Sequence, residues 1–182
     1  MIGAVNPLAA GLSAVAIFLV ASGIWLFAWL PVSRRRLSYE FELVVARPAS
    51  EVFDAISDVR RWPTDQADAI IAIDHIAPEP LIVGSIITYL FRVKGTAQVG
   101  ADAVIAFDRG HEFALRAVGK PAVERYLMAP VQEGTVVRFS FEMIETVFAA
   151  LRGGVIRGRR ILDRRMARKQ RILQEMKARL EG

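Results

Sequence analysis

The sequence contains no cysteine and only two histidines, His75 and His111. Without cysteine the chain can form no disulfide, no thiolate nucleophile and no cysteine-ligated zinc site. Each histidine stands alone, in a predicted strand or beside a turn, and the sequence places no serine and aspartate partners near it. We therefore interpret both histidines as surface or structural residues, and we predict neither a metal nor a cofactor.

Charged side chains are absent from Leu8 to Leu30, a run of 23 residues. As a helix this run measures about 34 Å, enough to cross a hydrocarbon core of about 30 Å. A cleavable signal peptide would instead need a positive amino end and a shorter apolar run. A buried core helix would carry a polar side, whereas this run offers only Ser13 and Ser22. The run therefore predicts a transmembrane helix.

Residues typical of a membrane interface stand at the end of this run. Trp25 and Trp29 occupy its last turns, and Arg34, Arg35 and Arg36 follow. Tryptophan is enriched at membrane interfaces, and flanking arginines stay on the cytoplasmic side. We therefore expect these five residues at the surface of a lipid bilayer, in a single-pass protein whose N-terminus lies outside and whose C-terminal domain is cytoplasmic.

The rest of the chain has the size of one domain, so we expect an anchor with a basic juxtamembrane segment over 1–36 and one domain over 37–182.

Charge is segregated in that domain. Residues 37–152 contain 11 Lys and Arg against 16 Asp and Glu, and residues 153–182 contain 10 against 3. No zinc-finger, RNP-like or aromatic-basic motif is present, so we predict no nucleic-acid partner. The basic ends favour an anionic lipid surface.

Alternating apolar residues and closely spaced turn residues predict a consecutive antiparallel sheet. The predicted strands span 37–46, 69–76, 85–94, 96–108, 112–118, 122–128 and 135–144. In the fourth of them we expect Val99, Ala101, Ala103, Ile105 and Phe107 on one face. In the third, Tyr89 and Phe91 share one face and Leu90 and Arg92 the other, and the pattern does not say which face is concave.

Helical patterns lie on both sides of these strands. Residues 48–57 predict a short helix with Ser50 as its N-cap, and 58–62 a second helical piece that Pro63 ends. Residues 155–181 predict a long amphipathic helix. Its apolar positions recur at steps of three, four or seven: Leu162, Met166, Leu173, Met176 and Leu180. Its other side is basic, and we expect Arg164, Arg165 and Arg168 to contact anionic lipid headgroups.

Three segments carry a family resemblance. They are FELVVARPASEVFDAISDVRRWP at 41–63, the pair Gly134 and Thr135, and the ending MKARLE at 176–181. Together with the order of the predicted strands and helices, these segments make the domain resemble the START-like helix-grip superfamily of polyketide cyclase/dehydrase and lipid-transfer proteins, often called SRPBCC. The resemblance implies an α+β fold in which a curved antiparallel sheet wraps a long C-terminal helix and encloses an apolar cavity. Asp58 and Trp62 match the family's motif, and we interpret both as structural.

The first functional hypothesis is a non-enzymatic, membrane-anchored module that binds a lipid or another hydrophobic small molecule at the cytoplasmic face. Most members of the superfamily do no chemistry, and a tethered pocket meets membrane-dissolved ligands at high local concentration. The residues that we expect to line the cavity are Phe41, Leu43, Leu115, Phe139, Phe141, Leu162 and Met166.

Two alternatives remain open. Glu124 and Tyr126 are two residues apart in one strand, so both side chains can face the cavity and act as an acid/base pair in a cyclase/dehydratase-type enzyme. The other interpretation of this pair is a solvated strand face. A third hypothesis is a scaffold that docks a protein through the basic C-terminal helix.

Overall fold

The computed structural model describes residues 34–66, 69–93, 95–146 and 155–182. The chain divides into two units, Met1–Arg34 and Arg35–Gly182, and the described residues belong almost entirely to the second. The predicted membrane span, with Trp25 and Trp29, lies outside the described residues. Among the residues that are described, no helix is both long and apolar enough to cross a membrane.

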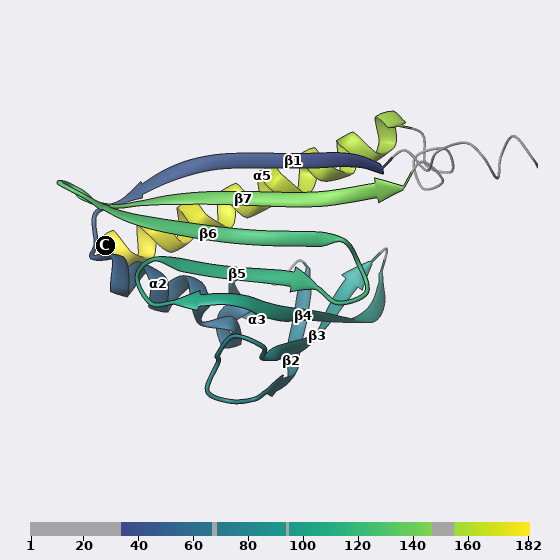
Figure 1. The fold of residues 1–182 in the computed structure, drawn as a ribbon, viewed down its shortest axis with the longest axis horizontal. Coiled ribbons are helices and arrows are strands. Elements are labelled where there is room, and N and C mark those ends of the chain that lie inside the picture. The colour runs from purple at the N-terminus through teal and green to yellow at the C-terminus, as the bar shows by residue number, and fades with distance from the viewer. Residues whose placement is uncertain (1–33, 67–68, 94, 147–154) are drawn as a thin grey trace, which may run out of the picture. The chain divides into compact units, whose positions relative to one another are not determined.

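The described strands form one seven-stranded sheet with the order β1-β7-β6-β5-β4-β3-β2 (Figure 1). They are β1 (Arg34–Val45), β2 (Ile70–Ala77), β3 (Ile86–Val93), β4 (Thr96–Asp108), β5 (Glu112–Ala117), β6 (Ala122–Val131) and β7 (Gly134–Thr146). Strands β2 to β7 pair in sequence order, each antiparallel to the next. The strand at the edge, β1, instead pairs with β7 and so joins the two ends of the domain.

One long helix, α5 (Val155–Glu181), crosses one face of the curved sheet (Figure 1). Its buried residues are Leu162, Met166, Leu173 and Met176, which join a single core with the inner face of the sheet. This confirms the predicted α+β class and the helix-grip arrangement of sheet and C-terminal helix. The helix has the bounds that the periodicity predicts.

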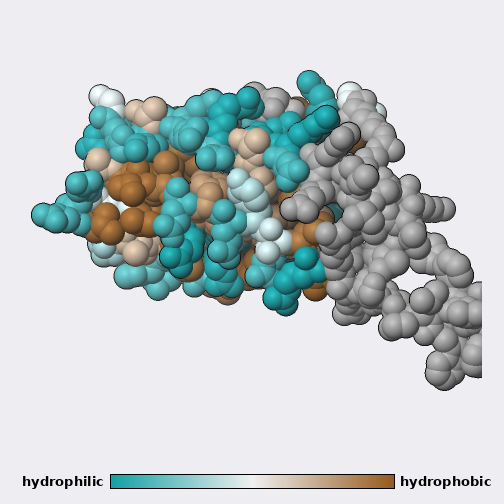
Figure 2. Space-filling view, turned by 90° about the horizontal axis from the view of Figure 1, so that it is seen from above, coloured by the Kyte–Doolittle hydropathy of each residue, from teal (hydrophilic) through white to brown (hydrophobic). Residues whose placement is uncertain are grey.

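Strand β1 begins three residues earlier than predicted, so Arg34, Arg35 and Arg36 belong to the strand. On its outer side β1 forms ion pairs with β7, between Arg36 and Glu142 at 3.9 Å and between Glu42 and Arg138 at 2.7 Å. On its inner side Leu37, Tyr39, Phe41 and Leu43 are partly buried, whereas Val45 at the end of the strand is fully buried. Figure 2 looks onto the side of the unit where β1 lies, and hydrophobic surface shows there between hydrophilic side chains.

The short helices differ from the prediction in two details. Helix α2 (Ala49–Ser57) starts after Pro48, so Ser50 lies inside its first turn, and no side chain caps the helix. The predicted N-cap is therefore wrong. A 3₁₀ turn, η1 (Val59–Arg61), leads into α3 (Trp62–Asp65), in which Pro63 occupies the first turn rather than the end. Proline fits there because the first amides of a helix have no intrahelical acceptor.

Strand β4 contains an irregularity that overturns one prediction. The register of β4 against β5 shifts between Val104 and Ala106, which is typical of a β-bulge. Before the shift Val99 is 69% exposed, whereas after it Phe107 points inward and its ring lies 5.1 Å from that of Phe53. The five residues from Val99 to Phe107 therefore do not share one face.

The three segments that carry the family resemblance meet at one corner of the fold, which we call the closing corner. Gly134 passes so close to β1 that a Cβ would collide with the Val45 carbonyl oxygen, and its φ is 135°. The Thr135 hydroxyl donates to the Arg47 carbonyl at 2.7 Å. At the end of α5, the Glu181 carboxylate accepts a hydrogen bond from the Ala46 amide at 2.7 Å. These contacts fix β1, β7 and α5 to one another.

Candidate functional site

Glu124 and Tyr126 both lie on the inner face of the sheet. Glu124 is paired with Leu115 on one side and with Phe141 on the other, and residues directly opposite each other in a sheet share a face. Leu115 and Phe141 are buried, so this face is the one beneath α5. Tyr126, two residues further along, is 4% exposed and donates to Glu124 Oε2 at 3.2 Å. The solvated-face interpretation of this pair is therefore wrong.

Lys169 of α5 completes this cluster from above. Its Nζ lies 3.0 Å from Glu124 Oε2, and the ammonium also lies over the rings of Tyr126 and Phe139, 5.5 Å and 5.8 Å from their centroids. The lysine side chain is 14% exposed, and that of Glu124 is 32% exposed. A helix cation and a strand carboxylate thus form an ion pair inside the apolar layer between α5 and the sheet.

A second polar pair lies beside the first, on β3 and β4. Tyr89 and Asp102 face the same side of the sheet and their side chains are hydrogen-bonded. The Tyr89 ring lies against Gly100, where an added Cβ would come within 2.7 Å of the ring. Trp62 packs edge-on against this ring at 5.9 Å. Glycine at position 100 therefore gives the tyrosine the room to reach Asp102.

The titration behaviour of these groups follows from their surroundings. Burial, followed by repulsion from Glu124, raises the pKa of Asp102 to about 6. Burial acts to lower the pKa of Lys169, but the attraction of Glu124 and the contact with Tyr126 outweigh it, so this pKa lies above its ordinary value. Burial is also the main reason why the pKa values of Tyr89 and Tyr126 are raised. Near neutral pH Lys169 is a cation and both phenols keep their protons.

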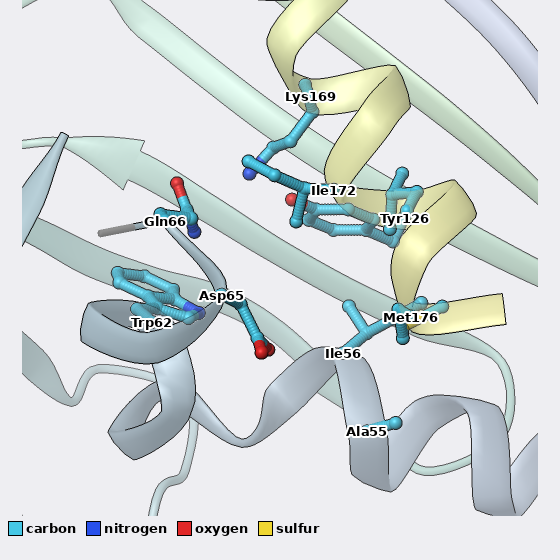
Figure 3. A pocket seen from close by; sticks show the side chains of 10 residues that line it. Ala55, Ile56, Trp62, Asp65, Gln66, Tyr126, Lys169, Ile172 and Met176 are labelled. Atoms are coloured by element: carbon cyan, nitrogen blue, oxygen red, sulfur yellow. The ribbon is translucent and has the colours of Figure 1, made fainter. Parts of the chain in front are cut away.

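A pocket of about 30 Å³ opens between the short helices and α5, next to this cluster. Its lining residues are Ala55, Ile56, Trp62, Asp65, Gln66, Tyr126, Lys169, Ile172, Leu173 and Met176. Figure 3 shows the Lys169 nitrogen and the Tyr126 hydroxyl close together, on the side that faces Gln66 and Trp62. An ion pair between Asp65 and Arg179, 2.8 Å apart, ties α3 to α5 at the rim.

The residues predicted to line a cavity are placed elsewhere, in the packed core. Leu115, Phe139, Phe141, Leu162 and Met166 are buried there. Phe41 and Leu43 pack against that core from β1 and are partly buried, with the ring of Phe41 5.2 Å from that of Phe139. None of these seven residues lines the described pocket, whereas Trp62, interpreted from the sequence as structural, does.

The other predicted residues occupy the surface or the turns. Arg164 and Arg165 are exposed on α5, and Arg168 is half-buried. His75 and His111 are exposed. Asp58 joins α2 to η1 and accepts a hydrogen bond from the Arg61 amide through its backbone carbonyl. Within the described ranges, no group of three histidine or carboxylate side chains is arranged to hold a metal ion.

Two members of the site, Lys169 and Asp102, were missed by the sequence reasoning. Lys169 lies three residues after Met166 and four before Leu173, so it occupies a position of the apolar stripe. The pattern was instead followed directly from Met166 to Leu173, seven residues on. A lysine at a core position of an amphipathic helix was the available signal. Asp102 carries no such signal, because a polar residue between Ala101 and Ala103 fits the alternation of an ordinary solvent-facing position.

No family model and no curated protein matches the sequence, but solved structures match the fold. The di-domain ARO/CYC StfQ from the steffimycin biosynthetic pathway superposes with a TM-score of 0.62 at 17% identity, over 79% of this chain and 50% of StfQ. The chain thus spans half the length of that protein. The Polyketide_cyc-like protein Cgl2372 from Corynebacterium glutamicum has a TM-score of 0.59 at 22% identity, over 81% and 93% of the two chains.

A third match is norcoclaurine synthase from Thalictrum flavum, in complex with dopamine and hydroxybenzaldehyde, with a TM-score of 0.62 at 17% identity over 83% of this chain and 90% of that one. The fold is the helix-grip fold. At these identities the likeness concerns the fold alone. Two of the matching structures, StfQ and Cgl2372, are polyketide-cyclase-like proteins.

Proposed function

We propose that this chain is a membrane-anchored helix-grip module that binds a hydrophobic small molecule between its sheet and α5, at the cytoplasmic face of a membrane. The observation that carries the proposal is the pocket beside the Glu124–Lys169 ion pair. It joins an apolar wall, with Ile56, Leu173 and Met176, to a polar end inside the core. Apolar walls with a few convergent polar groups are typical of small-molecule sites.

The pocket must widen to take such a ligand. At about 30 Å³ it has the size of one water molecule, whereas sites for drug-sized molecules measure roughly 300–1,000 Å³. Helix α3 is the wall that we expect to move, because it has only four residues. The Asp65–Arg179 ion pair at the rim holds it to α5. This pair is partly exposed, and exposed ion pairs contribute only about 0–1 kcal/mol, so its opening costs little. Norcoclaurine synthase, which shares the fold, forms a complex with dopamine and hydroxybenzaldehyde.

The membrane part of the proposal has two contacts. The run from Leu8 to Leu30 crosses the bilayer, with Trp25, Trp29 and the arginines at 34–36 at its interface. Arg164, Arg165 and Arg168 of α5 face anionic headgroups of the same leaflet, and a tether raises the local concentration of that surface. A ligand dissolved in the bilayer then reaches the pocket without crossing the aqueous phase.

A matched pair of substitutions tests ligand binding. Ala55 lines the pocket, and Ala55→Phe fills it, whereas Ala129→Phe places the same side chain on the exposed part of β6. The full chain, purified in lipid nanodiscs, is expected to release a bound small molecule in native mass spectrometry, and so is the Ala129 variant. The Ala55 variant is expected to lose it. Equal release from all three proteins, or release from none, would contradict the proposal.

A second candidate function is a cyclase/dehydratase-type enzyme, and Asp102 is the observation that favours it. A carboxyl group with a pKa of about 6 beside a phenol can give and take a proton near neutral pH. Glu124 is less suited, because Lys169 holds it in an ion pair. If the chain dehydrates its ligand, the molecule bound to an Asp102→Asn variant will be heavier by one water than that bound to the unchanged protein. Identical masses would rule out dehydration.

A further inference from the structure

The charges around the pocket limit which ligands can enter it. Two charged residues line the pocket, Asp65 and Lys169. Asp65 is paired with Arg179 at the rim, 2.8 Å away, whereas Lys169 brings its charge to the polar end, where Glu124 matches it at 3.0 Å. Asp102 adds a second carboxylate on the same inner face, hydrogen-bonded to Tyr89. Among the described residues, the remaining charge acting on Asp102 is that of Lys120, which is exposed and lies 6.0 Å above the Phe91 ring.

An anionic ligand group would therefore enter a site whose single buried cation is already paired. It would lose its hydration next to the Glu124 carboxylate that already pairs with Lys169, and ionised groups buried without a partner are strongly disfavoured. A cationic group is disfavoured for a different reason. Its contact point in the pocket is the ammonium of Lys169, which repels it within the same apolar layer.

An uncharged oxygen meets neither obstacle. The Lys169 ammonium has three N–H donors, of which Glu124 and Tyr126 take two. Its nitrogen points into the space that Gln66 and Trp62 also face (Figure 3). The remaining donor, with the Gln66 amide, can bind a hydroxyl or carbonyl oxygen without any change in the charge of the site. Trp62 and Ile56 then cover the apolar part of the ligand.

We propose that the pocket selects an uncharged hydrophobic molecule that carries a hydroxyl or carbonyl group, and that it excludes fatty-acid-like anions and amines of the same size. This inference rests on the proposed function, since it names the ligand class of that same pocket. It also separates two surfaces of the module. The outer side of α5 attracts anions through its arginines, whereas the inner side rejects them.

Three probes with the same alkyl chain test the inference. The full chain contains three tryptophans, at 25, 29 and 62. A Trp25→Phe, Trp29→Phe background leaves Trp62 as the single tryptophan beside the pocket. This protein, in phosphatidylcholine nanodiscs at about pH 7.5, is titrated with dodecanol, dodecanoate and dodecylamine while the Trp62 emission is recorded. Dodecanol is expected to saturate the change at a concentration about tenfold lower than either charged probe.

A charge substitution supplies the control. Glu124→Gln leaves Lys169 without its counter-charge, so dodecanoate binding is expected to improve about tenfold while dodecanol changes by less than about threefold. Glu142→Gln removes the same charge from the exposed side of β7 and is expected to change neither probe. Preference for dodecanoate or dodecylamine, or equal binding of all three, overturns the inference and leaves the binding function standing. Saturation by none of the probes overturns the binding function itself.

Discussion

Lys169 is the residue that connects α5 to Glu124 and Tyr126 on β6. It reaches from α5 across the apolar layer to Glu124, and its ammonium is nearly covered by the rings of Tyr126 and Phe139. A buried ion pair of this kind contributes little net stability, but removing one partner leaves the other charge without compensation. The pair therefore fixes the position of α5 over β6 more than it adds to the free energy of unfolding.

This view predicts a strongly non-additive pair of substitutions. Lys169→Met alone leaves the partly exposed Glu124 carboxylate unpaired and is expected to lower the free energy of unfolding by about 1–3 kcal/mol, whereas the double variant Lys169→Met, Glu124→Gln recovers most of the loss. Urea unfolding of the full chain, followed by circular dichroism, measures both values. Additive losses in the double variant would show that the two side chains do not act as a pair.

The raised pKa of Asp102 predicts a pH-dependent stability. The folded protein holds this proton up to about pH 6, whereas the ordinary value is 3.8, so the folded state binds protons more tightly in that window. The contribution of Asp102 to stability is therefore full below about pH 4, falls by roughly 2 kcal/mol as the pH rises to about 6, and levels above that. Asn cannot ionise, and Asp102→Asn is expected to match the unchanged protein near pH 4 and to exceed it by about that amount at pH 7.

Thermal unfolding of the two proteins between about pH 4 and pH 7 provides the measurement for Asp102. The comparison at low pH serves as the internal control, because there both side chains are neutral and both accept the Tyr89 hydroxyl. A stability difference that stays constant over this range would contradict the assignment of the proton to Asp102.

At the scale of elements, hydropathy periodicity predicted the strands and α5 well because each has one buried face. From Val155 onwards the apolar positions of α5 recur without an intervening proline, so its bounds could be derived from the residues alone. The bulge in β4 could not be derived in this way. One extra residue between Val104 and Ala106 leaves the apolar–polar alternation of the sequence unchanged, but the residues after it point to the opposite face of the sheet. The inward side of Asp102 followed from pairing with Ile87, which only the register reveals.

The closing corner yields a prediction for the turn before β7. Gly134→Ala forces a Cβ into the Val45 carbonyl at a positive φ and is expected to lower the free energy of unfolding by more than about 3 kcal/mol. Gly119 offers a matched control, because its φ is also positive, at 73°, but nothing lies within 4 Å of an added Cβ. Gly119→Ala is expected to cost about 1 kcal/mol, since it meets only the backbone strain.

Chemical unfolding of the two glycine variants under the same conditions compares them directly. Similar losses at both positions would show that the left-handed backbone, rather than the approach of β7 to β1, is what requires glycine at 134. The same approach gives a structural reason for the Gly134 and Thr135 pair on which the family resemblance rests.

At the scale of the whole molecule, the fold followed from the sequence but the pocket did not. The order of strands and helices suffices to specify a helix-grip arrangement. The pocket instead depends on how Trp62 and Gln66 pack against Ile172 and Met176, which are far apart in the sequence. The predicted cavity residues, such as Phe139 and Leu162, were chosen for being apolar and inward, and such residues pack together until little space remains.

The proposed membrane topology is directly testable, because the chain contains no cysteine. Single substitutions Ala4→Cys and Ala129→Cys place one thiol before the predicted span and one on the exposed end of β6. A membrane-impermeant maleimide added to intact cells is expected to label position 4, and to label position 129 only after lysis. Labelling of position 129 in intact cells, or of neither site before lysis, would contradict an outward N-terminus.

The pairing of β1 with β7 also means that the first strand to be synthesised has to wait for the last strand before it can pair. β1 leaves the ribosome first, but its partner begins only at Gly134, almost a whole domain later. At usual rates of translation this delay lasts roughly 5–20 s. During that time a nascent strand with an unpaired backbone waits, and the charges of Arg36, Glu40 and Glu42 oppose its pairing with neighbouring chains. The first strand made is the last to be closed in.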